Sequence, residues 1–244
     1  MSSARTLREL FSVGADDAPA LTAPGGVPLT HRGLRTLIDE TVARLNAMGI
    51  GRGDRVAIVL PNGPCMASAF LSVAAGAASA PLNPAYRADE FEFYLGDLGA
   101  KGLIVEAGSD SPAVAVARKL GVRVIELHPK PELGAGAFVL DDGGVAATAV
   151  RPGMATADEV ALVLHTSGTT SRPKIVPLSQ ANVCASARNI RDFLSLTGND
   201  RGLNIMPLFH IHGLIAGISA PLSAGGQVCC TPGFNALRFF AWME

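Results

Sequence analysis

The stretch from Val163 to Leu178 holds the residues whose types and spacing are best suited to chemistry. Four hydroxyl side chains, a glycine and a lysine follow one another closely there: Thr166, Ser167, Gly168, Thr169, Thr170 and Lys174. Hydroxyl groups, backbone N–H groups and an ammonium together bind polyphosphates, and a glycine lets the backbone approach an anion closely. The stretch therefore predicts a nucleotide-phosphate loop; the alternative is a surface turn rich in Ser, Thr and Gly.

The spacing within this loop differs from that of the Walker loop, whose second glycine and lysine open a helix. Pro173 directly precedes Lys174, lacks an N–H group and disfavours a helical conformation at Arg172. We therefore expect a flap over the phosphates rather than a helix N-terminus. The apolar residues 160–164 ahead of the loop predict a strand that leads into it.

Two histidines, His210 and His212, follow the strand-like residues 203–206. Side chains two residues apart on an extended segment share a face, so both imidazoles could donate hydrogen bonds to one carboxylate. The alternative is that one of them bonds to the backbone in the core. No third ligand accompanies them, which argues against zinc, and the sequence indicates no metal site.

The elements that must position these residues alternate between apolar strand-like runs and helical patterns, which predicts an α/β fold with Rossmann-like mixed sheets and flanking helices. Helices are expected over residues 34–48, 63–76, 88–98 and 112–120, after Ser179 and after Asn235. Strands are expected over residues 55–60, 78–82, 103–105, 122–127, 137–140, 160–164, 203–206 and 227–230.

Composition narrows the class of protein. Lys and Arg number 20 against 21 Asp and Glu, and no basic stripe appears, so we expect no nucleic-acid partner. The low-charge residues 64–82 predict a buried helix rather than a membrane span. No signal peptide is seen. The cysteines lack metal-ligand spacing and are expected to be reduced, buried thiols in a cytoplasmic or organellar protein: Cys65, Cys184, Cys229 and Cys230.

The loop resembles the signature loop of the adenylate-forming superfamily, which includes acyl-CoA synthetases, 4-coumarate–CoA ligases, luciferases and peptide-synthetase adenylation domains. The pattern Thr/Ser-Ser-Gly-Thr-Thr-Gly-x-Pro-Lys-Gly matches residues 166–170 and 173–174, with Ser171 and Ile175 where glycine is usual. The oxalate–CoA ligases of plants and fungi have a loop sequence similar to Ser171-Arg172-Pro173-Lys174. Residues 53–62, 81–95 and 206–214 carry further similarity.

This resemblance implies an AMP-forming acid–CoA ligase that uses ATP, Mg²⁺ and CoA and, in the oxalate branch, activates oxalate. Residues 166–170 and Lys174 would bind the β- and γ-phosphates, and Lys174 would stabilise the leaving pyrophosphate. His210 and His212 would line the acyl site, where a small, cationic-capable wall suits a short diacid. Many relatives carry Tyr or Phe at the position of His165, which favours packing there over catalysis.

Members of the superfamily are usually about twice as long as this chain. The resemblance therefore implies a partial N-terminal AMP-binding domain, with a first α/β subdomain over about 1–128, an irregular connection over 129–158 and the start of the phosphate-loop and acyl-site region over 159–244. The family segments that hold Mg²⁺ and the ribose, and the C-terminal domain with its catalytic lysine, do not map onto this chain, so we expect it to be inactive alone.

Two alternatives to the oxalate ligase remain open. One is a 4-coumarate-like or medium-chain acyl-CoA ligase, and the other is a non-catalytic truncated remnant or splice product. A peroxisomal signal would lie at a C-terminus that this chain does not show. The sequence leaves the oligomeric state open.

Overall fold

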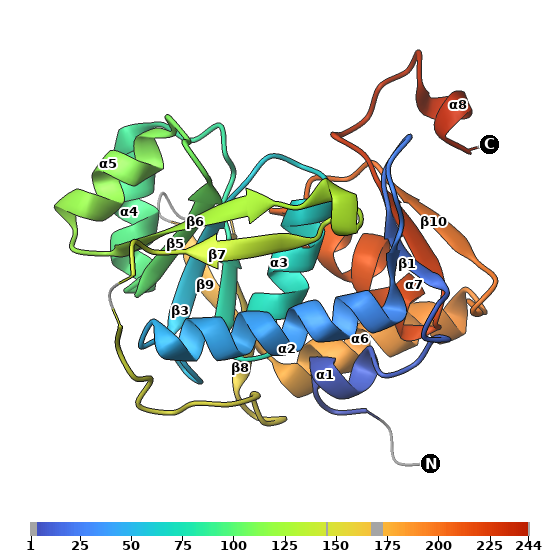
Figure 1. Cartoon of the computed structure of the whole chain (residues 1–244), viewed down its shortest axis with the longest axis horizontal. Helices are drawn as coiled ribbons and strands as arrows, with labels where there is room; N and C mark the ends of the chain where they lie inside the picture. The colour runs from blue at the N-terminus through green and yellow to red at the C-terminus, as the bar shows by residue number, and fades with distance from the viewer. Residues whose placement is uncertain (1–3, 145, 167–172, 244) are drawn as a thin grey trace.

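Two β-sheets organise the chain in the computed structural model, which describes residues 4–144, 146–166 and 173–243 (Figure 1). The larger sheet has the strand order β7-β6-β5-β3-β4-β8-β9, and the smaller has the order β10-β11-β1-β2. The strands are β1 (Pro19–Thr22), β2 (Leu29–Thr30), β3 (Arg55–Val59), β4 (Ala78–Pro81), β5 (Gly102–Glu106), β6 (Arg123–Pro129), β7 (Phe138–Asp141), β8 (Val160–Thr166), β9 (Lys174–Ser179), β10 (Arg201–Asn204) and β11 (Gln227–Cys230).

Helices cover both faces of the larger sheet. They are α1 (Leu7–Leu10), α2 (His31–Ala47), α3 (Pro64–Ala74), α4 (Ala88–Leu98), α5 (Pro112–Lys119), α6 (Gln180–Phe193), α7 (Ala220–Ser223) and α8 (Phe239–Met243), with a 3-10 turn η1 (Pro131–Leu133) and a π-helix η2 (His212–Ser219). One hydrophobic core includes side chains of α2 and α3, and a second includes those of α4 and α5. This confirms the predicted α/β class with mixed sheets.

The central strands of the larger sheet form because their residues are apolar on both faces. The β3 strand pairs in parallel with β4 and with β5, and four of its five residues are buried. Strands buried on both faces read as continuous apolar runs, which is why the sequence predicted them. The predicted helix over residues 63–76 is α3, whose residues 66–74 are all buried and which therefore belongs to the core.

Helix starts follow local capping chemistry. Ser179 precedes α6, as predicted, and its Oγ accepts the N–H of Asn182 at 3.2 Å. The helix expected after Asn235 begins later, at Phe239, and the Asn235 side chain accepts the N–H groups of Leu237 and Arg238 in the turn ahead of it. Helix α8 lies at the edge of the molecule in Figure 1, and Phe239, Trp242 and Met243 line a pocket together with residues of β10.

The smaller sheet joins the two ends of the chain. Strand β1 pairs in parallel with β11, with Leu21 opposite Val228, and β2 follows β1 in an antiparallel pair. Each sheet therefore contains strands from both sides of the expected division near residue 128. Strands β1 and β2 share a sheet with β10 and β11, and β8 and β9 share the larger sheet with β3, β4 and β5. The sequence did not predict β1 and β2, which are short and rely on this distant pairing.

His31 is the first residue of α2 and is 1% exposed. Its Nε2 lies 3.1 Å from the carbonyl oxygens of Gly225 and of Gly226, so it ties α2 to the loop before β11. Burial lowers the pKa of His31, and the two carbonyl hydrogen bonds act in the opposite direction. The imidazole thus serves as a buried hydrogen-bond donor.

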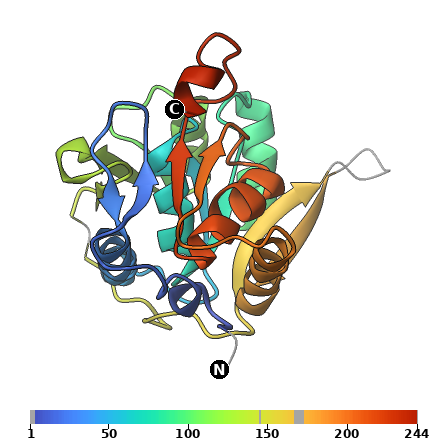
Figure 2. The ribbon, with the colours of Figure 1, turned by 90° about the vertical axis from the view of Figure 1, so that its right-hand side faces the viewer.

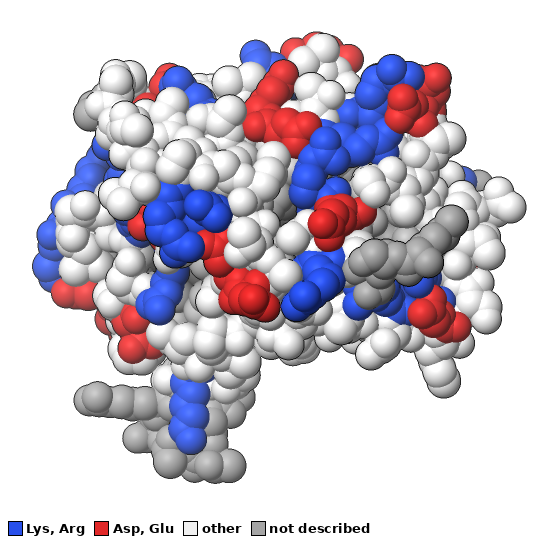
Figure 3. All heavy atoms as spheres, turned by 90° about the horizontal axis from the view of Figure 1, so that it is seen from below, with Lys and Arg blue, Asp and Glu red and all other residues white. Residues whose placement is uncertain are grey.

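Acidic and basic side chains are interspersed on the face drawn in Figure 3. Close ion pairs join Arg8 to Asp39 at 2.7 Å and Lys119 to Glu92 at 2.7 Å. Such exposed pairs stabilise a fold by at most about 1 kcal/mol each, so the two cores carry the fold. Within the described residues, no helix has both the length and the apolar character to cross a membrane.

Candidate functional site

The predicted phosphate loop follows β8 and precedes β9 in the sequence, and these two strands form an antiparallel hairpin. Thr166 ends β8, Lys174 begins β9, and the two residues are directly opposite one another in the ladder. Figure 2 shows this hairpin extending from the body of the molecule. Of the predicted loop residues, Ser167, Gly168, Thr169 and Thr170 lie outside the described residues.

No helix follows the loop, as its proline predicted; the strand β9 that begins at Lys174 was not predicted. Ile175, which stands where glycine is usual in the family pattern, is a half-buried residue of β9 opposite His165. It is not among the described residues with positive φ. A β-branched side chain suits an extended strand, so this substitution introduces no backbone strain.

The segment that carries the two candidate histidines is a turn followed by the π-helix η2, which corrects the expected extended conformation. The N–H of His210 bonds to the Pro207 carbonyl at 3.3 Å, and His212 is the first residue of η2. Residues two apart on a helical turn do not share a face. Instead, the N–H of His212 donates to Nδ1 of His210 at 3.3 Å.

Both histidine side chains are exposed. Because Nδ1 of His210 accepts a hydrogen bond, a neutral His210 carries its proton on Nε2. No partner for that Nε2 is found among the described residues, so it can donate to a ligand. The structure therefore brings His210 and His212 together, although by a turn rather than by strand periodicity.

Two glycines permit the tight packing of η2. A Cβ at Gly213 would lie 2.4 Å from the Pro207 carbonyl oxygen, and one at Gly217 would lie 2.3 Å from Oδ1 of Asn204. Any larger residue would push η2 away from the end of β10. Since π-helical turns concentrate at functional sites, this close seating of the segment after the two histidines marks the region as a site.

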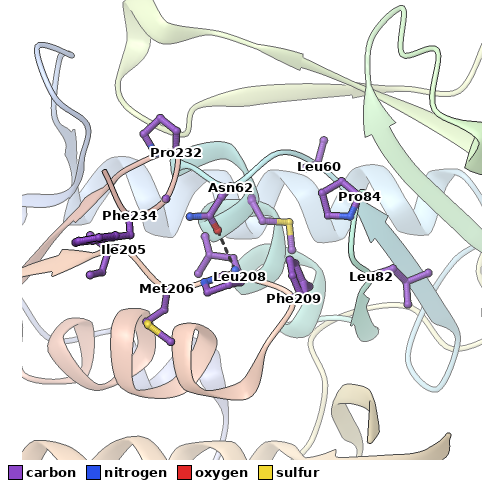
Figure 4. Close-up of a pocket in the computed structure, with 13 residues that line it drawn as sticks. Leu60, Asn62, Leu82, Pro84, Ile205, Met206, Leu208, Phe209, Pro232 and Phe234 are labelled. Atoms are coloured by element: carbon purple, nitrogen blue, oxygen red, sulfur yellow. Dashed lines mark hydrogen bonds between the residues drawn. The ribbon is translucent and has the colours of Figure 1, made fainter. Parts of the chain in front are cut away.

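A cavity of about 410 Å³ opens beside this turn, where the carboxyl ends of four parallel strands from the two sheets converge (Figure 4). Apart from Met66 of α3, its lining residues follow β3, β4, β10 and β11 directly. They are mostly apolar: Leu60, Asn62, Met66, Leu82, Pro84, residues 205–209 and residues 232–234. Ligands of open α/β sheets bind at the carboxyl ends of the strands. The cavity is therefore the best candidate for a ligand pocket in the described part of the chain.

Asn62 connects three walls of this cavity. Its Oδ1 accepts the N–H of Leu208 at 2.9 Å, as drawn in Figure 4, and its Nδ2 donates to the Thr231 carbonyl at 3.0 Å. Thr231 in turn donates its hydroxyl to the Asn204 carbonyl at 2.9 Å. Asn62 was not among the predicted site residues, because the residues it connects are far away along the chain.

The cavity carries no charged side chain, so it suits an uncharged group better than a carboxylate. Among the residues that the structure describes, no group of three or more His, Cys, Asp or Glu is arranged to hold a metal ion. These residues therefore do not provide a complete magnesium site. Lys174, the predicted phosphate ligand, is an exposed residue at the start of β9 and does not line this cavity.

The comparisons with known proteins agree with this geometry. The family described as AMP-binding enzyme matches residues 12–244. The chain is 42% identical to an oxalate–CoA ligase of Arabidopsis thaliana, over 93% of this chain and 45% of that protein. It is 32% identical to an oxalate–CoA ligase of Saccharomyces cerevisiae, over 98% of this chain and 50% of that protein. The chain thus spans about half the length of these curated relatives.

A solved structure supports the same conclusion. The apo form of MatB from Rhodopseudomonas palustris superposes with a TM-score of 0.82 at 26% sequence identity, covering 98% of this chain and 47% of that one. Its fold matches both sheets of the chain described here. With a match that extends from residue 12 to residue 244, the chain belongs to the AMP-binding enzyme family.

Proposed function

We propose that this chain forms the phosphate-binding and acyl-site portion of an AMP-forming acid–CoA ligase. One observation carries the proposal: Thr166 and Lys174 face each other where the β8–β9 hairpin leads into the loop, within a chain of the AMP-binding family. A hydroxyl and an ammonium at the two ends of a glycine-containing loop suit the β- and γ-phosphates of ATP.

The reaction has two steps in this proposal. A carboxylate oxygen attacks the α-phosphorus of ATP, the bond to the bridging oxygen breaks, and pyrophosphate leaves. The CoA thiol, losing its proton, then attacks the acyl carbon, and AMP leaves. Lys174 would hold the pyrophosphate and offset its developing charge, which for a single electrostatic donor lowers a barrier by about 3–4 kcal/mol.

Mg²⁺ accompanies ATP in such a reaction and would neutralise phosphate charge. The described residues provide no complete ligand set for it, so we assign no metal ligand in this chain. The residues of this chain contribute binding and orientation: Lys174 and Thr166 toward the phosphates, and His210, with Nε2–H free to donate, toward the carboxylate.

Oxalate is the proposed acid, supported by the identity to the two oxalate–CoA ligases. The histidines His210 and His212 supply hydrogen-bond donors suited to a small dianion. A specific observation favours a second candidate, a medium-chain or 4-coumarate-like acid, because the cavity next to His210 is apolar. In the oxalate proposal, the same cavity would receive an uncharged part of CoA.

Titration of ATP into the chain, followed by calorimetry, tests the nucleotide part of the proposal. We expect Lys174→Ala to weaken binding about tenfold or more, since it removes a charged donor. Lys119→Ala is the matched control, because Lys119 lies on α5, outside β8 and β9, and forms an exposed ion pair with Glu92. Equal affinity of wild type and Lys174→Ala would refute the assigned role, and no ATP binding at all would favour a non-catalytic chain.

Titration of acids in the presence of ATP, followed by NMR, tests the substrate. Oxalate binding that is lost in a His210→Ala variant supports the oxalate proposal. Octanoate or 4-coumarate binding that is lost in a Phe209→Ala variant, with no response to oxalate, supports the second candidate instead.

A further inference from the structure

The end of the phosphate-loop hairpin has little support from the sheet. Strand β9 is the edge strand of the larger sheet, so among the described strands it pairs with β8 alone. Strand β8 meets β4 at one register position, Leu162 opposite Ser79, near the start of β8. The residues that lead into the loop, 164–166 and 174–176, lie beyond that position (Figure 2). Another contact must therefore fix where the hairpin points.

His165 makes such a contact with α4. Its Nε2 lies 3.0 Å from Oδ2 of Asp97, so the imidazole N–H donates to the carboxylate. The His165 side chain is 5% exposed and that of Asp97 is 40% exposed. Among the described residues of 163–166 and 173–177, this is the side-chain hydrogen bond that joins the hairpin to another element.

Aromatic rings also contact the His165 side chain. Its ring meets Tyr94 of α4 edge to face, with centroids 4.6 Å apart, and Tyr94 stacks on Tyr86 at 4.7 Å. Ile175, directly opposite His165 on β9, packs against the same hydrophobic core. His165 of β8 therefore rests on α4, and Ile175 beside it packs against the core that includes side chains of α4; both residues are one position from Thr166 and Lys174.

A ring packed on Tyr94 would hold the hairpin near α4 without fixing its rotation. A hydrogen bond adds a direction, because N–H···O bonds weaken steeply away from linearity. A buried imidazole N–H without an acceptor is also destabilising, so the Asp97 carboxylate selects one placement of the ring. Since Thr166 follows His165 and lies opposite Lys174, that placement sets the positions of both loop ends.

We propose that the His165–Asp97 pair is a positioning device for the phosphate loop, fixing Thr166 and Lys174 against α4 so that they meet the nucleotide. The inference rests on the proposed function of the loop. It assigns a positioning role to His165, where the sequence favoured packing, and it makes Asp97 of α4 a determinant of nucleotide affinity.

The test compares four variants of the full chain with wild type: Asp97→Ala, Asp97→Asn, His165→Phe and the control His128→Phe. Phenylalanine at 165 keeps a ring for Tyr94 but removes the donor, whereas asparagine at 97 keeps an acceptor oxygen. His128 is a half-exposed histidine of β6 with Glu126 at 3.7 Å, away from the hairpin. Amide hydrogen exchange measures how often the hairpin opens. Calorimetry measures the ATP dissociation constant, and urea unfolding measures global stability.

We expect exchange at residues 164–166 and 174–176 to accelerate about tenfold in Asp97→Ala and in His165→Phe, the effect of losing one hydrogen bond to a charged group. The ATP dissociation constant should rise by a similar factor while the urea midpoint stays near that of wild type. Asp97→Asn should restore most of both properties, and His128→Phe should change neither.

Unchanged hairpin exchange in Asp97→Ala and His165→Phe would overturn the proposal. Faster exchange with unaltered ATP affinity would also overturn it, because the pair would then be structural only. A long-range ¹H–¹⁵N NMR spectrum of wild type gives an independent reading: protonation of His165 at Nε2 supports the pair, and protonation at Nδ1 overturns it. If wild type does not bind ATP, the proposed function fails, while the exchange rates still decide whether the pair holds the hairpin.

Discussion

Replacing Asn62 by alanine should destabilise the chain through the cavity walls that this side chain joins. The change removes two hydrogen bonds, one of 2.9 Å from the Leu208 N–H and one of 3.0 Å to the Thr231 carbonyl. Leu208 and Thr231 are 1% and 0% exposed, so the backbone groups left behind are largely shielded from water.

Each buried group left without a partner costs about 1–3 kcal/mol. Two such groups would cost about 2–6 kcal/mol, and water entering from the adjacent cavity can satisfy part of this demand. We therefore expect a loss of about 2–4 kcal/mol in the free energy of unfolding, a large part of the roughly 5–15 kcal/mol typical of a folded domain. Urea titration followed by far-UV circular dichroism measures this loss.

Two further variants separate the loss of the two Asn62 hydrogen bonds from the general effects of substitution. Asn62→Asp keeps the acceptor for Leu208 but places a carboxylate oxygen against the Thr231 carbonyl, so it should destabilise at least as much as alanine. Asn199→Ala changes an exposed asparagine and should have an effect within about 0.5 kcal/mol. A loss below about 0.5 kcal/mol in Asn62→Ala would refute the reasoning, since the two hydrogen bonds would then carry no net stability.

Three other predictions concern packing, pH and thiol reactivity. Gly217→Ala should lower the free energy of unfolding by about 1–3 kcal/mol, because the new Cβ would lie 2.3 Å from Oδ1 of Asn204. Gly96→Ala in α4 should raise the free energy of unfolding by about 0.5–1 kcal/mol, because no atom lies near the position of the new Cβ. Urea titration measures both changes. Burial lowers the pKa of His31 below its ordinary value of 6.5, so the unfolded chain binds a proton at His31 more readily than the folded chain does. The contribution of His31 to stability should therefore be full above pH 6.5 and should fall as the pH drops below that value. Urea midpoints measured against pH should show a smaller fall in His31→Gln than in wild type. Burial raises the pKa of Cys65 to about 11, so a thiol reagent near neutral pH should modify it slowly until urea unfolds the chain, and rapid modification of the folded chain would contradict the burial.

Local sequence patterns determined much of the fold. The parallel strands β3 to β6 and the helices between them were predicted because continuous apolar runs and three-to-four-residue periodicity are properties of short stretches of chain. The loop chemistry was equally local: hydroxyls, Gly168 and Lys174 follow one another, and Pro173 predicted that a helix does not start there. The resemblance carried by these same residues led to the AMP-binding family, which the comparisons confirm.

Tertiary structure alone decided how the site is assembled. Asn62 and Leu208 are 146 residues apart along the chain, and His31 and Gly225 are 194 apart, so no periodicity could reveal their contacts. The turn that brings His210 beside His212 likewise depends on Gly213 packing against Pro207. Residue type and spacing determine which chemistry a chain can offer, whereas the cavity at the strand ends and the His165–Asp97 contact exist only because packing brings distant segments together.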